Sequence, residues 1–264
     1  MEIQYHLSPG ELLAFLEPVY GGCVAGFSEE ELSAAEGELG IRLPAAYRNF
    51  LRGYGKCSLN SVQNQLIAPS NLQLIYDHYR EERDEDYDPD DPEWGVDRWF
   101  NGTDWDETIN PLAELFQHPE SEWGRFVKDH LIIWHENQGC WIAGIRVEDF
   151  EKDTIPVYIP DELYTYAWEM EFPSLEEFLT RMIFDAVAYN DPRVLSESSD
   201  IQNFFSEHQI DRKTLCPPEA CSPSGHCRSF FLPEKRLLGF FLYDVNGEPD
   251  ALYLYALPES ENVF

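Results

Sequence analysis

The segment from Ser28 to Gly55 constrains the fold of this chain more than any other stretch. Ser28 and Glu31 have the spacing of a capping box, in which the hydroxyl accepts from a backbone amide and the carboxylate reaches back. Apolar residues then recur on one helical face, and Gly40 supplies a left-handed stop. The pattern predicts a helix from Glu29 to Leu39.

A second helix is predicted directly after the first one. Pro44 lacks a backbone N–H and has a preset φ angle, so it suits the first helical turn. Large side chains follow at helical spacing, and Gly55 ends the pattern. They are Tyr47, Phe50, Leu51 and Tyr54. We therefore expect a helical hairpin, Glu29 to Leu39 and Pro44 to Tyr54, whose aromatic face is part of the core and not a cofactor site.

Strand and helix patterns alternate along the rest of the chain. "NQLIAPSNL" reads as a short strand closed by Pro69, with a helix opening at Ser70. "LIIWHENQGCWIAGIRV" reads as two strands around a turn, and "TIPVYIP" reads as a third strand whose Pro156 suits an edge position. Ser174 and Glu177 form another capping-box pattern before an amphipathic helix. "LLGFFLYDV" and "DALYLYAL" predict a hairpin near the end of the chain.

The composition changes sharply at "DEDYDPDDPE", where seven of ten residues are acidic and none is basic. These acidic residues are Asp84, Glu85, Asp86, Asp88, Asp90, Asp91 and Glu93. Two prolines disfavour regular structure, so the stretch is predicted to be a surface loop. Trp94, Trp99 and Trp105 follow within an acidic context, which a purely solvating segment would not contain.

Two units are expected. Residues 1–190 form the first, with an acidic, Trp-rich insertion at about 80–125, and residues 191–264 form an extension of a helix and a β-hairpin packed on the first.

The charge balance excludes some classes of partner. Eighteen Lys and Arg residues stand against 50 Asp and Glu residues, a net charge of −32. This charge repels phosphate backbones and anionic lipid surfaces, whereas it attracts a basic protein. With no signal peptide, no long apolar run and six scattered Cys residues, the chain is expected to be cytoplasmic with reduced thiols.

Four segments in this order resemble the SMI1/KNR4 family of the SUKH superfamily, over roughly residues 25–185. They are "FSEEELSAAEGELGIRLPAAYRNFLRGYG", "ENQGCWIAGI", "DTIPVYI" and "WEMEFPSLEEFLTRMI". The resemblance implies an α+β fold, with a mixed or antiparallel sheet flanked by the N-terminal helical hairpin and further helices. It also implies architectural roles for Leu43, Pro44, Tyr47, Phe50 and Leu51, which match the family's signature. The matching turn residues Asn137 and Gln138 are expected to bond exposed backbone and not a ligand.

No catalytic residues or cofactors are predicted, because no nucleophile elbow, zinc helix or phosphate loop is present. Asp86, Asp88 and Asp90 have the spacing of the first calcium-loop ligands, but the required Gly and the bidentate Glu are missing. A zinc site in "CPPEACSPSGHC" is also disfavoured, since the two-residue spacing between paired cysteines is absent. Cys216, Cys221 and Cys227 are therefore expected to be free thiols in a loop.

The resemblance implies a non-enzymatic immunity protein that binds and neutralises a toxin, as many family members do, nucleases being among their targets. Charge favours a basic toxin domain. The partner-binding residues are expected to be the seven acidic residues of 84–93 together with Trp94, Trp99 and Trp105. The three Trp rings are equally expected to be interface anchors or to pack their own loop against the core. Two alternatives remain: a regulatory scaffold of the SMI1/KNR4 type and, more distantly, a metal-dependent enzyme.

Overall fold

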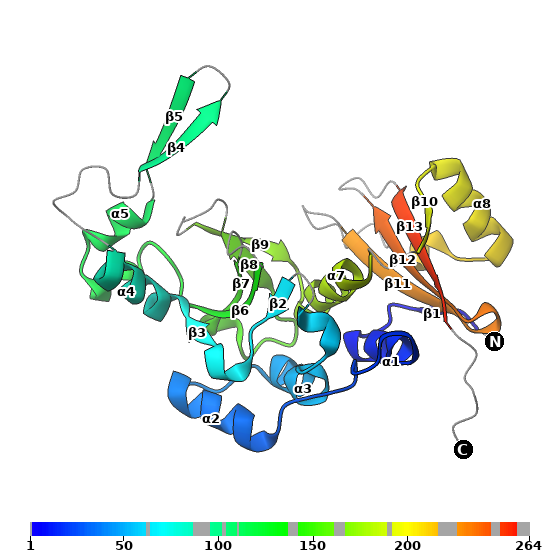
Figure 1. Cartoon of the computed structure of the whole chain (residues 1–264), viewed down its shortest axis with the longest axis horizontal. Coiled ribbons are helices and arrows are strands. Elements are labelled where there is room, and N and C mark those ends of the chain that lie inside the picture. Colours follow the sequence, from blue (N-terminus) through cyan, green and yellow to red (C-terminus); the bar gives the residue numbers. More distant parts are fainter. Residues whose placement is uncertain are drawn as a thin grey trace.

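The computed structural model covers the whole chain and describes residues 2–61, 64–86, 96–101, 104–109, 111–136, 142–160, 167–188, 192–215, 226–243 and 249–257. In this part of the chain, two antiparallel sheets lie on either side of helix α7 (Leu175–Val187), with further helices around them (Figure 1). The fold is α+β, as the sequence predicts.

The first sheet has the strand order β2-β6-β7-β8-β9, and β3 also pairs with β6. Its strands are β2 (Asn64–Leu66), β3 (Gln73–Leu74), β6 (His130–Glu136), β7 (Ile142–Arg146), β8 (Val157–Pro160) and β9 (Trp168–Phe172). The register pairs Leu131 with Ile145, two fully buried residues from the predicted strands. Apolar side chains from these strands form the core against α3 and α7.

The second sheet has the order β1-β11-β12-β13-β10. Its strands are β1 (Gln4–Tyr5), β10 (Arg193–Leu195), β11 (His226–Leu232), β12 (Leu237–Tyr243) and β13 (Pro249–Ala256). The predicted terminal hairpin is present, with Phe240 paired to Tyr253. A division between residues 190 and 191 stays a prediction, and the structure adds that β1, from the start of the chain, joins this second sheet.

Three helices precede the first sheet: α1 (Pro9–Tyr20), α2 (Glu29–Leu39) and α3 (Ala45–Tyr54). Both bonds of the Ser28–Glu31 capping box form, and Gly40 adopts a left-handed φ of 68°. Pro44 is the cap before α3 and not its first helical residue.

Helix α7 links the cores of the two sheets. On one side the ring of Phe178 meets Trp134 of β6 edge-on, with ring centroids 6.2 Å apart. Further along the helix, Phe184 packs against Phe240 of β12 at 5.5 Å. Apolar residues from α1, α3, α7 and both sheets therefore form one continuous core.

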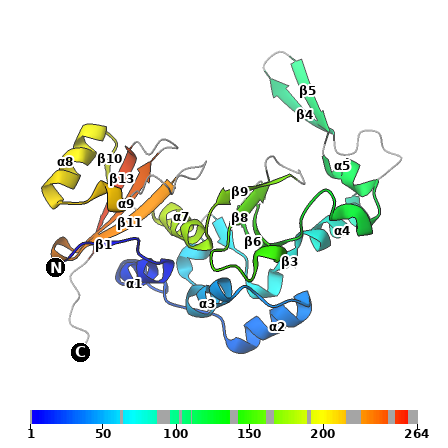
Figure 2. The ribbon, with the colours of Figure 1, turned by 180° about the vertical axis from the view of Figure 1, so that it is seen from behind.

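A second core lies on the other face of the second sheet, under α8 (Ser198–His208), which Figure 2 shows on the side of that sheet away from α7. The remaining helical elements are α4 (Ile75–Asp86), α5 (Pro111–Phe116), α6 (Glu120–Trp123), α9 (Arg212–Leu215) and the 3₁₀ turns η1 (Ser58–Ser61), η2 (Pro69–Asn71), η3 (Val147–Asp149) and η5 (Pro233–Lys235). Strands β4 (Val96–Asn101) and β5 (Asp104–Ile109) form a separate hairpin.

Three further sequence predictions are wrong in detail. The helix expected from Ser70 begins only at Ile75, because η2 and β3 occupy the intervening residues. Pro156 does not mark an edge strand: β8 lies between β7 and β9, and the proline precedes the strand, so it withholds no ladder hydrogen bond. The acidic stretch does not begin as a loop, because α4 continues through Asp86.

None of the helices described is long and apolar enough to cross a membrane.

Candidate partner-binding surface

Helix α4 carries the first of the predicted acidic residues and is fixed to the first sheet through its opening turns. Ile75 is fully buried. The hydroxyl of Tyr76 donates to the carbonyl of Val127 at 2.7 Å, and the hydroxyl of Tyr79 accepts from Nε1 of Trp168 at 3.3 Å. These contacts fix the opening turns of the helix, and its last turn contains Asp84, Glu85 and Asp86.

The two arginines near this end of α4 are already paired with carboxylates. Arg83 reaches Asp84 through Nε at 2.9 Å and Glu120 at 2.8 Å. Arg80 contacts the same Glu120 at 3.1 Å and also pairs with Asp77. The hydrogen bonds that Arg83 donates, first to Asp84 and then to Glu120, raise the pKa of its guanidinium. These cations are therefore committed to local partners.

The structure separates the predicted binding residues into three groups. Asp84, Glu85 and Asp86 lie in the last turn of α4, and Asp84 is exposed. Trp99 lies in β4 and Trp105 in β5. The other predicted residues, Asp88, Asp90, Asp91, Glu93 and Trp94, are outside the described residues.

The β4–β5 hairpin extends beyond the first sheet in Figure 1. Its register pairs Trp105 with Phe100 and Trp99 with Asp106. Acidic residues are concentrated here, since residues 84–109 contain eleven Asp and Glu residues and a single basic residue, Arg98. This region therefore carries a large share of the chain's negative charge with little compensation within its own sequence.

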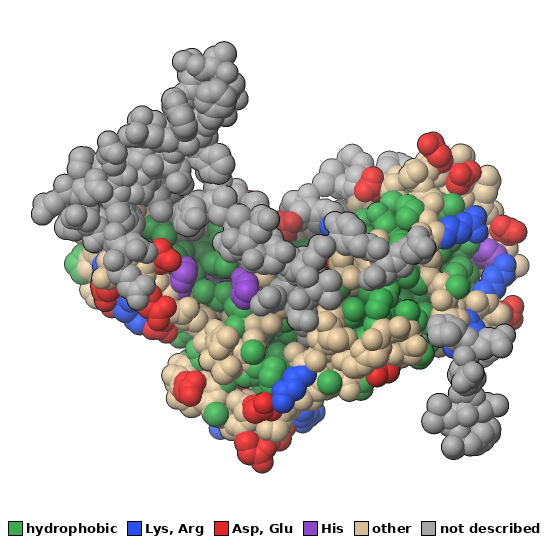
Figure 3. Space-filling view, in the orientation of Figure 1, with side chains coloured by type: hydrophobic (Ala, Val, Ile, Leu, Met, Phe, Trp, Pro, Cys, Tyr) green, Lys and Arg blue, Asp and Glu red, His purple; other side chains and the backbone are tan. Residues whose placement is uncertain are grey.

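The acidic helix α2 differs, because several of its carboxylates are paired with basic residues of α3 and the turn after it. Arg48 bonds Glu29 at 2.8 Å, and Lys56 bonds Glu31 at 2.8 Å. Figure 3 shows red and blue side chains close together over this part of the surface. Surface pairs of this kind contribute little stability, but they reduce the local field. The field that a basic partner would meet is therefore expected to be stronger at residues 84–109.

A buried polar cluster under the first sheet resembles a catalytic arrangement but has a structural explanation. Nδ1 of His130 lies 2.6 Å from the carbonyl of Lys128, while Nε2 is buried and has no hydrogen-bond partner in the described part of the chain. Burial lowers the pKa of His130 to about 4, so the ring is neutral at pH 7. The ring stacks on Trp168 at 4.3 Å, and nearby Asp149 accepts from Tyr158 at 2.9 Å. These side chains support the sheet, and no spacing in the sequence marked them.

The cysteine prediction needs a correction. Cys227 is a buried residue of strand β11 and not part of a loop, and burial raises the pKa of its thiol. Cys216 and Cys221 are outside the described residues, as are the turn residues Asn137 and Gln138. Within the described ranges, no group of three or more His, Cys, Asp or Glu side chains is placed to hold a metal ion.

The helical hairpin, the antiparallel sheet and helix α7 packed on it form a domain of the α+β class. The model of the SMI1 / KNR4 family (SUKH-1) matches residues 26–181, from the approach to α2 into α7. The chain belongs to this family, which confirms the resemblance found in its sequence. Its general role is therefore protein interaction of the immunity or regulatory type. No curated protein and no solved structure matches the chain.

Proposed function

We propose that the chain is a non-enzymatic immunity protein that binds a basic toxin domain, such as a nuclease, and blocks its active surface. Family membership over residues 26–181 is the observation that carries this proposal. The net charge of −32 supports a basic partner, because opposite charge accelerates encounter and like charge suppresses it.

The binding surface that we propose is the acidic region of residues 84–109. Its carboxylates attract the partner over several ångströms, and Trp94, Trp99 and Trp105 supply apolar contact once the complex has formed. In this division of work, charge sets the association rate, and the aromatic anchors set the dissociation rate.

The test begins with capture of the partner by the tagged full-length chain in its native host. The captured protein is then purified, and its toxic activity is measured with and without the chain. We expect stoichiometric loss of that activity, with no turnover of any substrate by the chain alone.

A captured partner that has no toxic activity, or whose activity is unaffected at saturating chain, would contradict the immunity proposal. A regulatory partner of that kind would instead support the scaffold alternative.

A further inference from the structure

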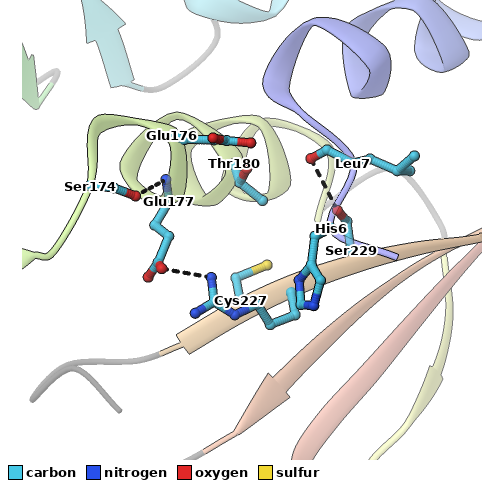
Figure 4. Close-up of a pocket in the computed structure, with 9 residues that line it drawn as sticks. His6, Leu7, Ser174, Glu176, Glu177, Thr180, Cys227 and Ser229 are labelled. Atoms are coloured by element: carbon cyan, nitrogen blue, oxygen red, sulfur yellow. Dashed lines mark hydrogen bonds and ion pairs between the residues drawn. The ribbon is translucent and has the colours of Figure 1, made fainter. Parts of the chain in front are cut away.

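A small pocket lies where three distant parts of the chain meet: the segment before α1, the first turns of α7 and the start of β11 (Figure 4). Its volume is about 250 Å³. Ligand pockets for drug-sized molecules are larger, about 300 to 1,000 Å³. The pocket therefore has room for one large side chain and not for a nucleotide. Its position between α7 and the second sheet is also typical, because binding sites favour the junctions of structural units.

The wall contributed by α7 is rich in hydrogen-bond acceptors. Thr180, which lines the pocket, is only 6% exposed, and its side chain makes no hydrogen bond to the other described residues. Glu176, in the first turn of the helix, is exposed and has no ion-pair partner there. The hydroxyl of Thr180 and the carboxylate of Glu176 are both acceptors, so this wall can receive hydrogen bonds from a ligand donor.

Among the described lining residues, the one Lys or Arg side chain is already neutralised. Arg228 of β11 bonds Glu177 at 2.8 Å, and both side chains are largely buried. The Nε of Arg228 is buried as well, so an incoming ligand cannot reach it. With this pair balanced, the unpaired carboxylate of Glu176 gives the pocket a net negative charge.

The opposite wall is held in place by specific contacts. His6 has a left-handed φ of 52°, which is uncommon for a residue with a side chain, and its Nε2 lies 2.6 Å from the carbonyl of Thr214. The Oγ of Ser229 donates to the carbonyl of Leu7 at 3.5 Å, a long bond that leaves the hydroxyl oxygen able to accept. Strained backbone of this kind persists only where the surrounding structure fixes it.

We propose that this pocket binds a guanidinium or ammonium group, presented as an Arg or Lys side chain of the protein partner. The lining offers acceptors and net negative charge, and these groups carry several donors and a positive charge. This inference rests on the proposed function, because the protein partner supplies the side chain. Arg is a frequent anchor residue in protein interfaces. It places a second contact far from residues 84–109.

The pocket is tested first without any partner. Ethylguanidinium is titrated into the full-length chain while the backbone amide NMR signals of Thr180 and Ser229 are followed, with acetate as the anionic control. We expect saturable shifts with ethylguanidinium alone. Loss of one charged hydrogen bond weakens binding by about tenfold, so Glu176→Gln should raise the Kd by about that factor. Glu30→Gln is the matched control, because Glu30 is also exposed in the first turn of a helix, α2.

Thr180→Val, which keeps the shape and removes the hydroxyl, should also weaken binding. Equal or tighter binding of acetate, no saturation by ethylguanidinium, or unchanged affinity in both pocket variants would overturn the proposal.

The second arm uses the captured partner, whose affinity Glu176→Gln should lower and Glu30→Gln should not. If ethylguanidinium binds but partner affinity is unchanged, the partner's side chain is not the occupant, and that part of the proposal fails. Because the first arm needs no partner, its failure is distinguishable from failure of the immunity proposal.

Discussion

Replacing Phe50 with Ala should destabilise the fold strongly, because this side chain joins α3 to the rest of the core. Phe50 is 8% exposed, and its ring lies 5.7 Å from that of Tyr54. It borders a gap of about 20 Å³ together with Trp134 and Ile183. Substitutions of this kind cost about 3 to 5 kcal/mol, through lost burial and the cavity that remains. The existing gap would merge with the new cavity, so little collapse is expected to offset the loss.

The measurement is the free energy of unfolding from urea titrations followed by circular dichroism. Arg52→Ala is the control on the same helix, since the Arg52 side chain is 55% exposed and its ion pair with Glu29 is long, at 3.5 Å. That change should cost less than about 1 kcal/mol. If Phe50→Ala is no more destabilising than Arg52→Ala, the buried face assigned to α3 is wrong.

Further predictions concern the backbone, a titration and a thiol. Gly26→Ala should abolish stable folding, because an added Cβ would lie 1.7 Å from the carbonyl oxygen of Arg52. Gly37→Ala, with open space around it, should stabilise α2 by about 0.5 to 1 kcal/mol in urea titrations, and equal effects of the two substitutions would refute this prediction. In the folded chain the pKa of His130 is about 4, below its ordinary value near 6.5. The unfolded chain therefore binds more protons between these pH values, and the free energy of unfolding should decrease as the pH falls through them. His130→Phe should flatten this dependence, and an unchanged slope would contradict the burial of a neutral His130. Burial raises the pKa of Cys23 to about 12, so this thiol should react with a thiol reagent at pH 8 only when urea unfolds the chain, and rapid native labelling would contradict its burial.

Local signals explain why parts of the fold were predictable. The start of α2 is fixed by Ser28 and Glu31 and its end by Gly40, all within one short stretch, so its bounds follow from the sequence. Helix α1 has an equivalent capping box at Ser8 and Glu11, which sequence reasoning passed over; Pro18 inside the helix obscures the helical pattern.

Long-range pairing explains what could not be predicted. Strand β1 has only two residues and exists because Gln4 and Tyr5 pair with Phe231 and Phe230 of β11, more than two hundred positions away. The pocket beside α7 depends on the same arrangement, since no local pattern links Thr180 to Ser229. The acidic concentration at residues 84–109 was largely visible in the sequence, but the pairing of α2 carboxylates with Arg48 and Lys56 emerges only in the structure.

The proposed steering role of residues 84–93 is measured by the salt dependence of the association rate with the captured partner. One variant replaces the acidic residues of 84–93 with their amides: Asp84, Glu85, Asp86, Asp88, Asp90, Asp91 and Glu93. An equally charged control replaces seven exposed carboxylates elsewhere: Glu2, Glu30, Glu38, Glu151, Asp153, Glu197 and Glu207. Wild type and control should associate quickly at low salt and slow steeply as salt rises, because screening weakens the steering field. The 84–93 variant should associate slowly at low salt with a flat dependence, while dissociation changes less. If that variant associates at the wild-type rate across low and high salt, residues 84–93 do not steer the partner, and the binding surface lies elsewhere on the domain.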